Sequence, residues 1–203
     1  MHDASFWDRI APAYSQQPVA DPAAWQRKLR VHKAMLKPTD AVLDVGCGTG
    51  SLCLELAPHA QRVHGVDYSA QMVAIARGKA DGLDHVTFTQ GTLDDLDGAS
   101  DVVSAYSLLH LVPDLDVALA ALYAATRPGG WFVSSTTTLG DSWIPYRPIL
   151  AVMRWIGKAP PVLMLTRAHL LARIAAAGFV DVALTDVGAD ATITYVVARR
   201  PAV

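Results

Sequence analysis

The feature that most restricts the fold is a glycine loop that directly follows a short apolar run. The run Ala41–Val45 leads into Gly46, Gly48 and Gly50, and a helical pattern then covers Ser51–Leu56. Glycine suits a sharp turn because it tolerates positive φ, and its missing Cβ lets a ligand lie against the backbone. The start of the next helix also presents free N–H groups. This pattern predicts a strand, a turn and a helix, in which the turn is either purely structural or part of a binding site.

Spacing within the loop argues against two phosphate-binding patterns. A dinucleotide loop of the form Gly-x-Gly-x-x-Gly would place its third glycine at position 51, where the chain has Ser51. A P-loop is excluded because no Gly-Lys-Ser/Thr follows. Asp67 ends the next apolar run, 21 residues after Gly46. In a doubly wound sheet, an acidic residue there can accept hydrogen bonds from ribose hydroxyls. Asp67 could instead cap the following helix together with Ser69, but the glycine loop favours the ribose.

The remaining pattern alternates short apolar runs with helical ones. Residues 1–40 predict two helices, the second opened by Asp21-Pro22 and closed near Lys37-Pro38. The expected strands are residues 41–45, 62–66, 86–89, 101–105, 131–135, 179–187 and 192–198. The alternation favours a parallel sheet covered by helices. Residues 137–165 are the most irregular stretch, and a last helix is expected from about Thr166 to Gly178.

Composition excludes several classes of protein. A chain of 203 residues with 52% hydrophobic and 18% charged residues can bury one sizeable core, which excludes global disorder. A net charge of -2 argues against a nucleic-acid-coating surface. The charge is uneven: residues 1–130 hold 10 Lys/Arg against 15 Asp/Glu, and residues 131–203 hold 7 against 4. This split is a weak indication of an anionic ligand near the C-terminal third.

Cysteine content and apolar runs indicate a cytoplasmic protein. Cys47 and Cys53 have no second pair, which excludes a disulfide framework and an all-cysteine zinc site. Met1-His2-Asp3-Ala4 lacks the basic region of a secretory signal. The longest apolar run of the irregular stretch, residues 149–153, is stopped by Arg154, far short of the roughly 20 residues that span a membrane. We therefore expect no stable membrane insertion.

Five sequence blocks carry a family resemblance. They are Val42-Leu43-Asp44-Val45-Gly46-Cys47-Gly48-Thr49-Gly50, Val66-Asp67-Tyr68-Ser69-Ala70-Gln71-Met72, Gln90-Gly91-Thr92-Leu93-Asp94, Asp101-Val102-Val103 running to Leu111, and Arg127-Pro128-Gly129-Gly130. In this order and spacing, the chain resembles the class I S-adenosylmethionine-dependent methyltransferases, in the small-molecule branch that includes the ubiquinone and menaquinone biosynthesis enzymes. The blocks cover about residues 40–135, and the last two expected strands extend the match toward the C-terminus.

The resemblance implies a fold and a division of the chain. The implied fold is α/β: a Rossmann-like, doubly wound sheet of seven mostly parallel strands, with the last strand antiparallel. A single methyltransferase domain would fill residues 1–203. Within it, residues 1–40 would be an N-terminal helical lid, 41–136 the cofactor-binding core, 137–165 a substrate-cap insertion, and 166–203 the C-terminal helix and strands.

The resemblance also implies which residues hold S-adenosylmethionine. The glycine loop would cradle the methionine part, with Asp44 ordering the loop or reaching the amino group through water. Asp67 would bind the ribose. Thr92 stands where the family usually has an aspartate for the adenine amino group. The implied cofactor residues are Tyr14, Asp44, Gly46, Cys47, Gly48, Gly50, Asp67, Tyr68, Met72, Thr92, Leu93 and Ala105.

Catalytic and substrate residues follow from the same resemblance. His110, and after it Tyr106, are the candidate general bases, because imidazole can take a proton near neutral pH. His110 could instead make hydrogen bonds within its own segment or line the cofactor pocket. Trp143, Tyr146 and Arg147 fall where the family usually builds its substrate cap. Arg147 would pair with an anionic substrate or remain a solvated surface residue. No metal is implied, because no acidic ligand cluster is recognisable.

The predicted function is methyl transfer from S-adenosylmethionine to a small, partly apolar molecule by in-line displacement, with S-adenosylhomocysteine as product. A base is needed only if the acceptor is a hydroxyl, a carbon acid or a protonated amine. Two alternatives remain open. An NAD-dependent oxidoreductase is disfavoured by Ser51, and a catalytically degenerate, cofactor-binding regulatory module is supported by Thr92 alone. The expected partner is a small methyl acceptor, with no nucleic acid, and the protein would be a monomer or homodimer.

Overall fold

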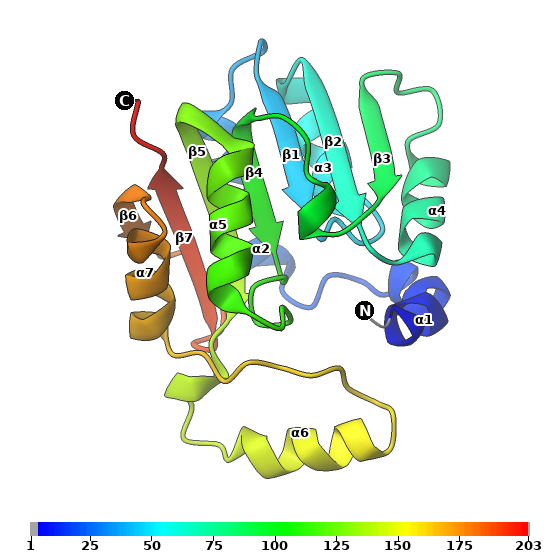
Figure 1. The fold of residues 1–203 in the computed structure, drawn as a ribbon. Helices are drawn as coiled ribbons and strands as arrows, with labels where there is room; N and C mark the ends of the chain where they lie inside the picture. The colour runs from blue at the N-terminus through cyan, green and yellow to red at the C-terminus, as the bar shows by residue number, and fades with distance from the viewer. Residues whose placement is uncertain (1–3, 203) are drawn as a thin grey trace.

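The computed structural model describes residues 4–202, so residues 1–3, which entered the expectation about a secretory signal, lie outside the described part. Figure 1 shows a sheet with helices on both faces and one helix, α6, beyond the end of the sheet. The elements are α1 Ser5–Ser15, α2 Pro22–Met35, β1 Ala41–Val45, α3 Ser51–Leu56, η1 Ala57–His59, β2 Arg62–Asp67, α4 Ala70–Lys79, β3 Val86–Gln90, η2 Leu93–Asp95, β4 Ser100–Tyr106, α5 Leu115–Ala125, β5 Thr126–Thr137, η3 Leu139–Asp141, α6 Tyr146–Trp155, α7 Arg167–Ala176, β6 Val180–Leu184 and β7 Ile193–Arg199.

The sheet has seven strands in the order β3-β2-β1-β4-β5-β7-β6. β1 pairs in parallel with both β2 and β4, and β7 runs antiparallel to both β5 and β6. The predicted fold class is thereby confirmed. The direction of the crossovers changes between β1 and β4, and ligands of doubly wound sheets bind at the carboxyl ends of the strands at such a point.

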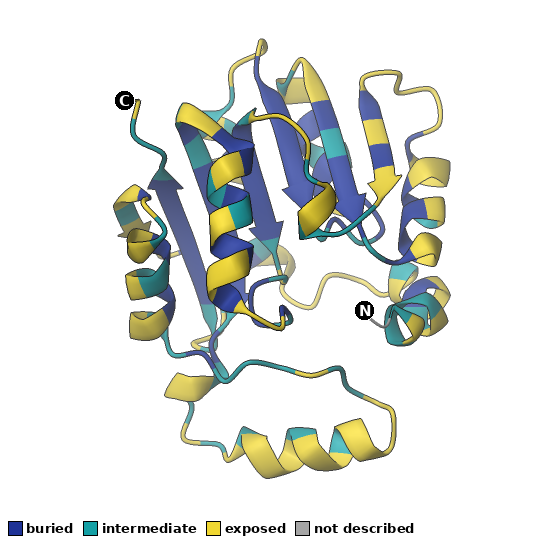
Figure 2. Ribbon diagram, viewed as in Figure 1, coloured by how far each residue is buried: buried dark blue, intermediate teal, exposed yellow. Residues whose placement is uncertain are grey.

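Two apolar layers hold the helices to the sheet. On one face, residues of β1, β4 and β7 pack with Leu119 and Leu122 of α5 and with Leu170 and Ile174 of α7. On the other face, α2, α3 and α4 cover the sheet, with Leu56 of α3 completely buried. Figure 2 shows the central strands as almost entirely buried, while each covering helix has one exposed side. Strands that are buried on both faces explain the nearly continuous apolar runs of the sequence.

Helix starts follow the predicted caps. The Asp21 carboxylate accepts the N–H of Ala24 at 2.9 Å, with Pro22 as the first residue of α2. The Ser69 hydroxyl accepts the N–H of Met72 at 3.2 Å, at the start of α4. Such caps satisfy N–H groups that have no partner within the helix.

Three local predictions differ from the structure. The strand expected at residues 131–135 is longer in the structure, since β5 covers Thr126–Thr137, and the N–H of Gly129 donates to the carbonyl of Arg200 at 3.0 Å, beyond the end of β7. β6 covers only Val180–Leu184 of the expected residues 179–187, and its pairing with β7 shifts register between Val180 and Ala183, where Asp181 has a φ of 52°. The irregular stretch 137–165 contains the helix α6. Within the described residues, no helix has the length and apolar content needed to cross a membrane.

Candidate functional site

The glycine loop forms the turn that the sequence predicts. Gly46, Gly48 and Gly50 have φ values of 71°, 52° and 78°, a region that side chains with a Cβ rarely adopt. A Cβ on Gly50 would lie 2.8 Å from Cζ of Phe88, whereas a Cβ on Gly48 would meet no atom within 4 Å. Gly50 therefore permits close packing below the loop, and Gly48 leaves the space above the backbone open.

Asp67 connects the end of β2 to this loop. One carboxylate oxygen accepts the N–H of Gly48 at 2.8 Å, and the other accepts the N–H of Ser69 at 2.9 Å. Burial raises the pKa of Asp67, while these two N–H groups act in the opposite direction. A carboxylate oxygen has two lone pairs, so both oxygens retain the capacity to accept a ligand hydroxyl.

Asp44 supplies a buried carboxylate with one oxygen unused. Oδ2 accepts the thiol of Cys53 at 3.5 Å, but Oδ1 is buried without a hydrogen-bond partner in the described chain. Burial raises the pKa of Asp44 to about 7. A buried acceptor without a partner is costly, and a cationic donor such as an amino acid ammonium group would satisfy it. The residues at this position therefore fit the methionine end of S-adenosylmethionine.

A cavity of about 700 Å³ joins these groups. Its wall comes from α1, α2 and the segment between them, from the carboxyl ends of β1, β2 and β4, and from the segment before β7. Ten of the twelve implied cofactor residues line it: Tyr14, Asp44, Gly46, Cys47, Gly48, Asp67, Tyr68, Met72, Thr92 and Leu93. The other two do not. Gly50 shapes the turn behind the wall, and Ala105 is fully buried in the core because it faces α5.

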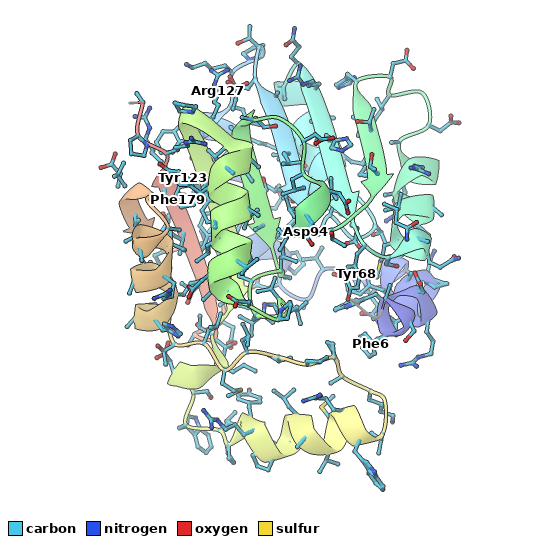
Figure 3. The ribbon with its side chains drawn as sticks, viewed as in Figure 1. Phe6, Tyr68, Asp94, Tyr123, Arg127 and Phe179 are labelled. Carbon is cyan, nitrogen blue, oxygen red and sulfur yellow. The ribbon has the colours of Figure 1, made fainter. Side chains whose placement is uncertain are left out.

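The turn at Thr92, which the resemblance implies for the adenine, has its side chain engaged in internal hydrogen bonds. The Thr92 hydroxyl donates to Oδ2 of Asp95 at 2.9 Å, and the same oxygen accepts the N–H of Thr92 at 2.8 Å. The Thr92 hydroxyl oxygen also accepts the N–H of Asp94 at 3.3 Å, so this reciprocal cap leaves the Thr92 side chain engaged within its own turn. Figure 3 shows Tyr68 and Asp94 at the carboxyl end of the sheet, after β2 and β3 respectively. Leu93 contributes to the wall beside Thr92.

The N-terminal helices close one side of the cavity. Oδ1 of Asp8 accepts the hydroxyl of Ser69 at 2.6 Å and the N–H of Gln71 at 3.1 Å, which fixes α1 at the start of α4. The segment between α1 and α2 continues this side of the cavity, and its residues 17–21 line the wall. Tyr14 lies in the wall with 46% of its surface exposed.

A chain of hydrogen bonds lies behind the cavity wall. The O–H of Tyr195 donates to the carbonyl of Lys28 at 3.2 Å, and the O–H of Tyr106 donates to the oxygen of Tyr195 at 2.9 Å. The Tyr106 oxygen must then accept Nδ1–H of His32 at 3.3 Å, which leaves Nε2 to accept the hydroxyl of Ser104 at 3.4 Å. Proton counting therefore assigns His32 as the Nδ1–H tautomer.

These hydrogen bonds limit the acid–base chemistry of Tyr106. Burial raises the pKa of Tyr106 well above its usual value and lowers the pKa of His32 to about 3. Both rings are consequently neutral at physiological pH, and the Tyr106 hydroxyl is occupied on both its donor and acceptor sides. Tyr106 lines the cavity, but the arrangement disfavours it as a base.

The remaining predicted residues lie away from the cavity. His110 is nearly buried and does not line it; burial lowers its pKa to about 4, and Nδ1 has no hydrogen-bond partner in the described chain. Trp143, Tyr146 and Arg147 are also absent from the wall, and Trp143 is 91% exposed. The roles assigned to these four residues stay predictions.

Other wall residues are not evident from any motif. Trp25 and Lys28 come from α2, Ser135 from β5 and Ile193 from β7. Burial lowers the pKa of the Lys28 ammonium group, and Asp21 partly offsets this effect. These residues come together only in the folded chain, so no local signal identifies them, although the apolar spacing of α2 does indicate which side faces the sheet.

Comparison with known proteins finds a family match in the central part of the chain. The family described as a methyltransferase domain matches residues 42–130, which include the glycine loop, Asp67 and the carboxyl end of β4. The match covers less than half of the chain, and over these residues the chain is similar to methyltransferase domains. The matched residues include those that the sequence analysis assigned to the cofactor, with the exception of Tyr14.

Two curated relatives and one solved structure illustrate the similarity. The chain is 38% identical over 97 residues to a trans-aconitate 2-methyltransferase of Deinococcus radiodurans, over 46% of this chain and 36% of the relative. It is 31% identical over 122 residues to a ubiquinone biosynthesis O-methyltransferase of a Bradyrhizobium species, over 57% of this chain and 47% of the relative. An S-adenosylmethionine-dependent methyltransferase structure from Mesorhizobium loti is 26% identical, with a TM-score of 0.70 over 89% of this chain and 99% of that one. The chain spans about half or less of the length of these curated relatives.

Proposed function

We propose that the protein transfers a methyl group from S-adenosylmethionine to a small, partly apolar molecule. The observation that carries the proposal is the cavity that joins the unpartnered oxygen of Asp44, the glycine loop and Asp67 within a methyltransferase domain. Asp44 would pair with the ammonium group of the cofactor, and Asp67 would accept its ribose hydroxyls. The bound cofactor supplies an activated methyl group, so no covalent enzyme intermediate is needed.

The rest of the wall would hold the acceptor. Trp25, Leu111, Val112 and Ile193 give this part of the cavity an apolar surface, and Lys28 adds one half-buried cation. Such a wall would exclude water and orient a nucleophile toward the methyl group, at about 3 to 3.5 Å in a reactive geometry. The apolar surface and the cation support an acceptor that is partly apolar and carries a polar or anionic group.

A thermal shift series tests the cofactor assignment directly. The purified chain would be heated with S-adenosylmethionine, S-adenosylhomocysteine or NAD, each at about 100 times its expected dissociation constant, where binding stabilises the folded state by about 2.7 kcal/mol. A rise in Tm with the first two ligands and none with NAD is expected. Stabilisation by NAD alone, or by none of the three, would contradict the proposal.

The base assignment needs a second test once an acceptor is known. His110 stays the predicted base, and its removal in His110→Gln would then lower kcat by about 10² to 10⁴ and abolish the acidic limb of the pH profile. Retention of kcat and of that limb would reject the role, and Tyr106→Phe would then be assayed in the same way.

Location and assembly also belong to the proposal. We propose a cytoplasmic protein, a monomer or a homodimer. Both cysteines are free and buried, which supports a reducing compartment. Size-exclusion chromatography with light scattering would determine the oligomeric state.

A further inference from the structure

The helix α6 has no buried residue, although its sequence is largely apolar. Three of its residues, Tyr146, Leu150 and Met153, are half-buried and lie three or four positions apart, so they share one side of the helix. A second apolar surface is turned to solvent, and we name it the apolar ridge. The apolar ridge consists of Pro148, Ile149, Val152, Trp155 and Ile156, of which Val152 is 59% and Trp155 86% exposed.

Cationic residues lie on α6 and directly after it. Arg147 and Arg154 are exposed and, at 100° per residue, fall within about 20° of one another around the helix axis, and Lys158 is exposed three residues after the end of the helix. Residues 142–180 contain no Asp or Glu. Among residues 4–202, none of these three cations forms an ion pair. We name Arg147, Arg154 and Lys158 the basic stripe.

Exposed tryptophans stand at both ends of α6. Trp143 precedes the helix and is 91% exposed, while Trp155, a member of the apolar ridge, ends it. Tryptophan is normally well buried in folded proteins. Its amphipathic ring is favoured where apolar chains meet water, and basic amphipathic helices with aromatic residues lie in that plane at membrane surfaces.

We propose that the apolar ridge and the basic stripe dock on the surface of a bilayer that contains anionic lipids. Lipid phosphates would neutralise the basic stripe, and the apolar ridge with Trp143 would enter the boundary between headgroups and acyl chains. A helix of 10 residues is about 15 Å long, half of the roughly 30 Å apolar core of a bilayer. The docking is therefore peripheral and reversible.

Charge distinguishes the bilayer from a second copy of the chain. In a twofold dimer across α6, the apolar ridge of one copy would face that of the other and bring two basic stripes together, without any acidic residue of 142–180 to compensate. An anionic surface complements the same stripe.

The position of α6 connects docking with the cavity. Figure 1 shows α6 beyond the carboxyl ends of the parallel strands, the edge of the sheet at which the glycine loop and Asp67 also lie. Nη2 of Arg9 donates to the carbonyl of Gly157 at 2.7 Å, so the segment after α6 is attached to α1, which also contributes to the cavity wall. A docked bilayer would lie at the edge from which a lipid-like acceptor could approach.

Vesicle binding without any methyl donor tests this docking independently of methyl transfer. The chain would be sedimented with large vesicles of phosphatidylcholine alone, or with vesicles of phosphatidylcholine mixed with the anionic lipid phosphatidylglycerol, which gives the surface a negative potential. We expect binding to the anionic vesicles, a blue shift of tryptophan emission, and release at 1 M salt, where the screening length is about 3 Å. Absence of binding to the anionic vesicles at 0.1 M salt would overturn the proposal.

Matched variants distinguish docking through α6 from the general effects of net charge and exposed apolar side chains. Arg147→Glu with Arg154→Glu should weaken vesicle binding at least about tenfold, since each basic residue near an anionic surface contributes to affinity. Lys37→Glu with Arg62→Glu makes the same change in net charge on exposed residues elsewhere and should leave binding unchanged. Val152→Ser should also weaken binding, whereas Val117→Ser, at 57% exposure on α5, should not.

Other occupants of the surface would give different results. If each control variant lost binding to the same extent as its α6 counterpart, docking through α6 would be rejected. A dimer in solution that Val152→Ser dissociates, without vesicle binding, would assign the apolar ridge to a second copy. Loss of tryptophan accessibility on adding S-adenosylhomocysteine, again without vesicle binding, would assign it to closure over the cavity.

Discussion

The Asp67 carboxylate accepts the N–H of Gly48 at 2.8 Å, which fixes the middle of the glycine loop to the end of β2. Two segments that the sequence analysis assigned to one cofactor are therefore in direct contact before any ligand is considered. A preformed contact of this kind reduces the ordering cost of binding. Changes at Asp67 should consequently affect both the loop and the affinity for the cofactor.

Replacing Asp67 with Ala is expected to weaken S-adenosylhomocysteine binding by about 1 to 3 kcal/mol. The ribose hydroxyls and the N–H groups that order the loop would both lose the carboxylate as their acceptor. Isothermal titration calorimetry would measure the change. Asp84→Ala removes an exposed carboxylate elsewhere and serves as control. Unchanged affinity in Asp67→Ala would exclude this residue as a ribose ligand.

Asp44 should make the stability of the ligand-free protein depend on pH. Its pKa in the folded chain is about 7, above the ordinary value of 3.8, so the folded state retains a proton that the unfolded chain has released between these values. The stability that protonated Asp44 contributes to the folded state is therefore fully present below about pH 4 and is lost as the pH rises through about 7. In Asp44→Asn this loss should vanish. Urea unfolding of both proteins from pH 4.5 to 8.5 would measure this effect. The unfolding free energy of the variant should increase relative to that of the native chain as the pH rises to about 7.

The same carboxylate should link cofactor affinity to pH in the opposite sense. An ammonium ligand binds the ionised form of Asp44, so affinity should rise from pH 5.5 to about 7 and then level off. Asp44→Asn should bind more weakly than the native chain at pH 8 and lose most of this dependence. Titrations at four pH values would measure both. Equal affinity of the two proteins at pH 8 would refute the pairing.

Tyr106→Phe should destabilise the fold by about 1 to 3 kcal/mol, because the Tyr195 oxygen and the Nδ1–H of His32 lose their shared partner. Tyr195→Phe removes the next link of the same chain. A double-mutant cycle with denaturant unfolding should therefore show that the two effects are not additive. Additive effects would mean that the two hydroxyls are not coupled.

Gly50→Ala should cost about 2 to 4 kcal/mol of stability, since the new Cβ meets Phe88 and the residue is held at positive φ. Gly82→Ala provides the matched control: its φ is 80°, but its Cβ would meet nothing within 4 Å. Gly82→Ala should lose only the stability that backbone strain costs. The difference in unfolding midpoint between the two variants would then report the cost of disturbing the packing below the loop. Equal losses would show that this packing is unimportant.

Local sequence was sufficient for the elements that follow from short-range physics. The glycine loop, the caps at Asp21 and Ser69, and the apolar strands all depend on residues within a few positions of one another. The fold class followed from their alternation together with the family blocks, which also located Asp44 and Asp67. The cap at Thr92 was equally local, because Asp95 stands three positions later, as in a capping box.

Tertiary structure decided what surrounds these elements. Trp25, Lys28 and Ile193 meet in one wall although more than 160 residues separate Lys28 from Ile193, since α2 and the segment before β7 converge at the same edge of the sheet. The hydrogen-bond chain from Ser104 to Lys28 likewise needs three separate segments in place. The sequence showed an apolar run at residues 149–153, but whether that surface would be buried depends on which other elements reach it. The sequence thus determined the loop through local backbone physics and located its two carboxylates through the family blocks, whereas long-range packing alone decided the cavity wall and left the apolar ridge exposed.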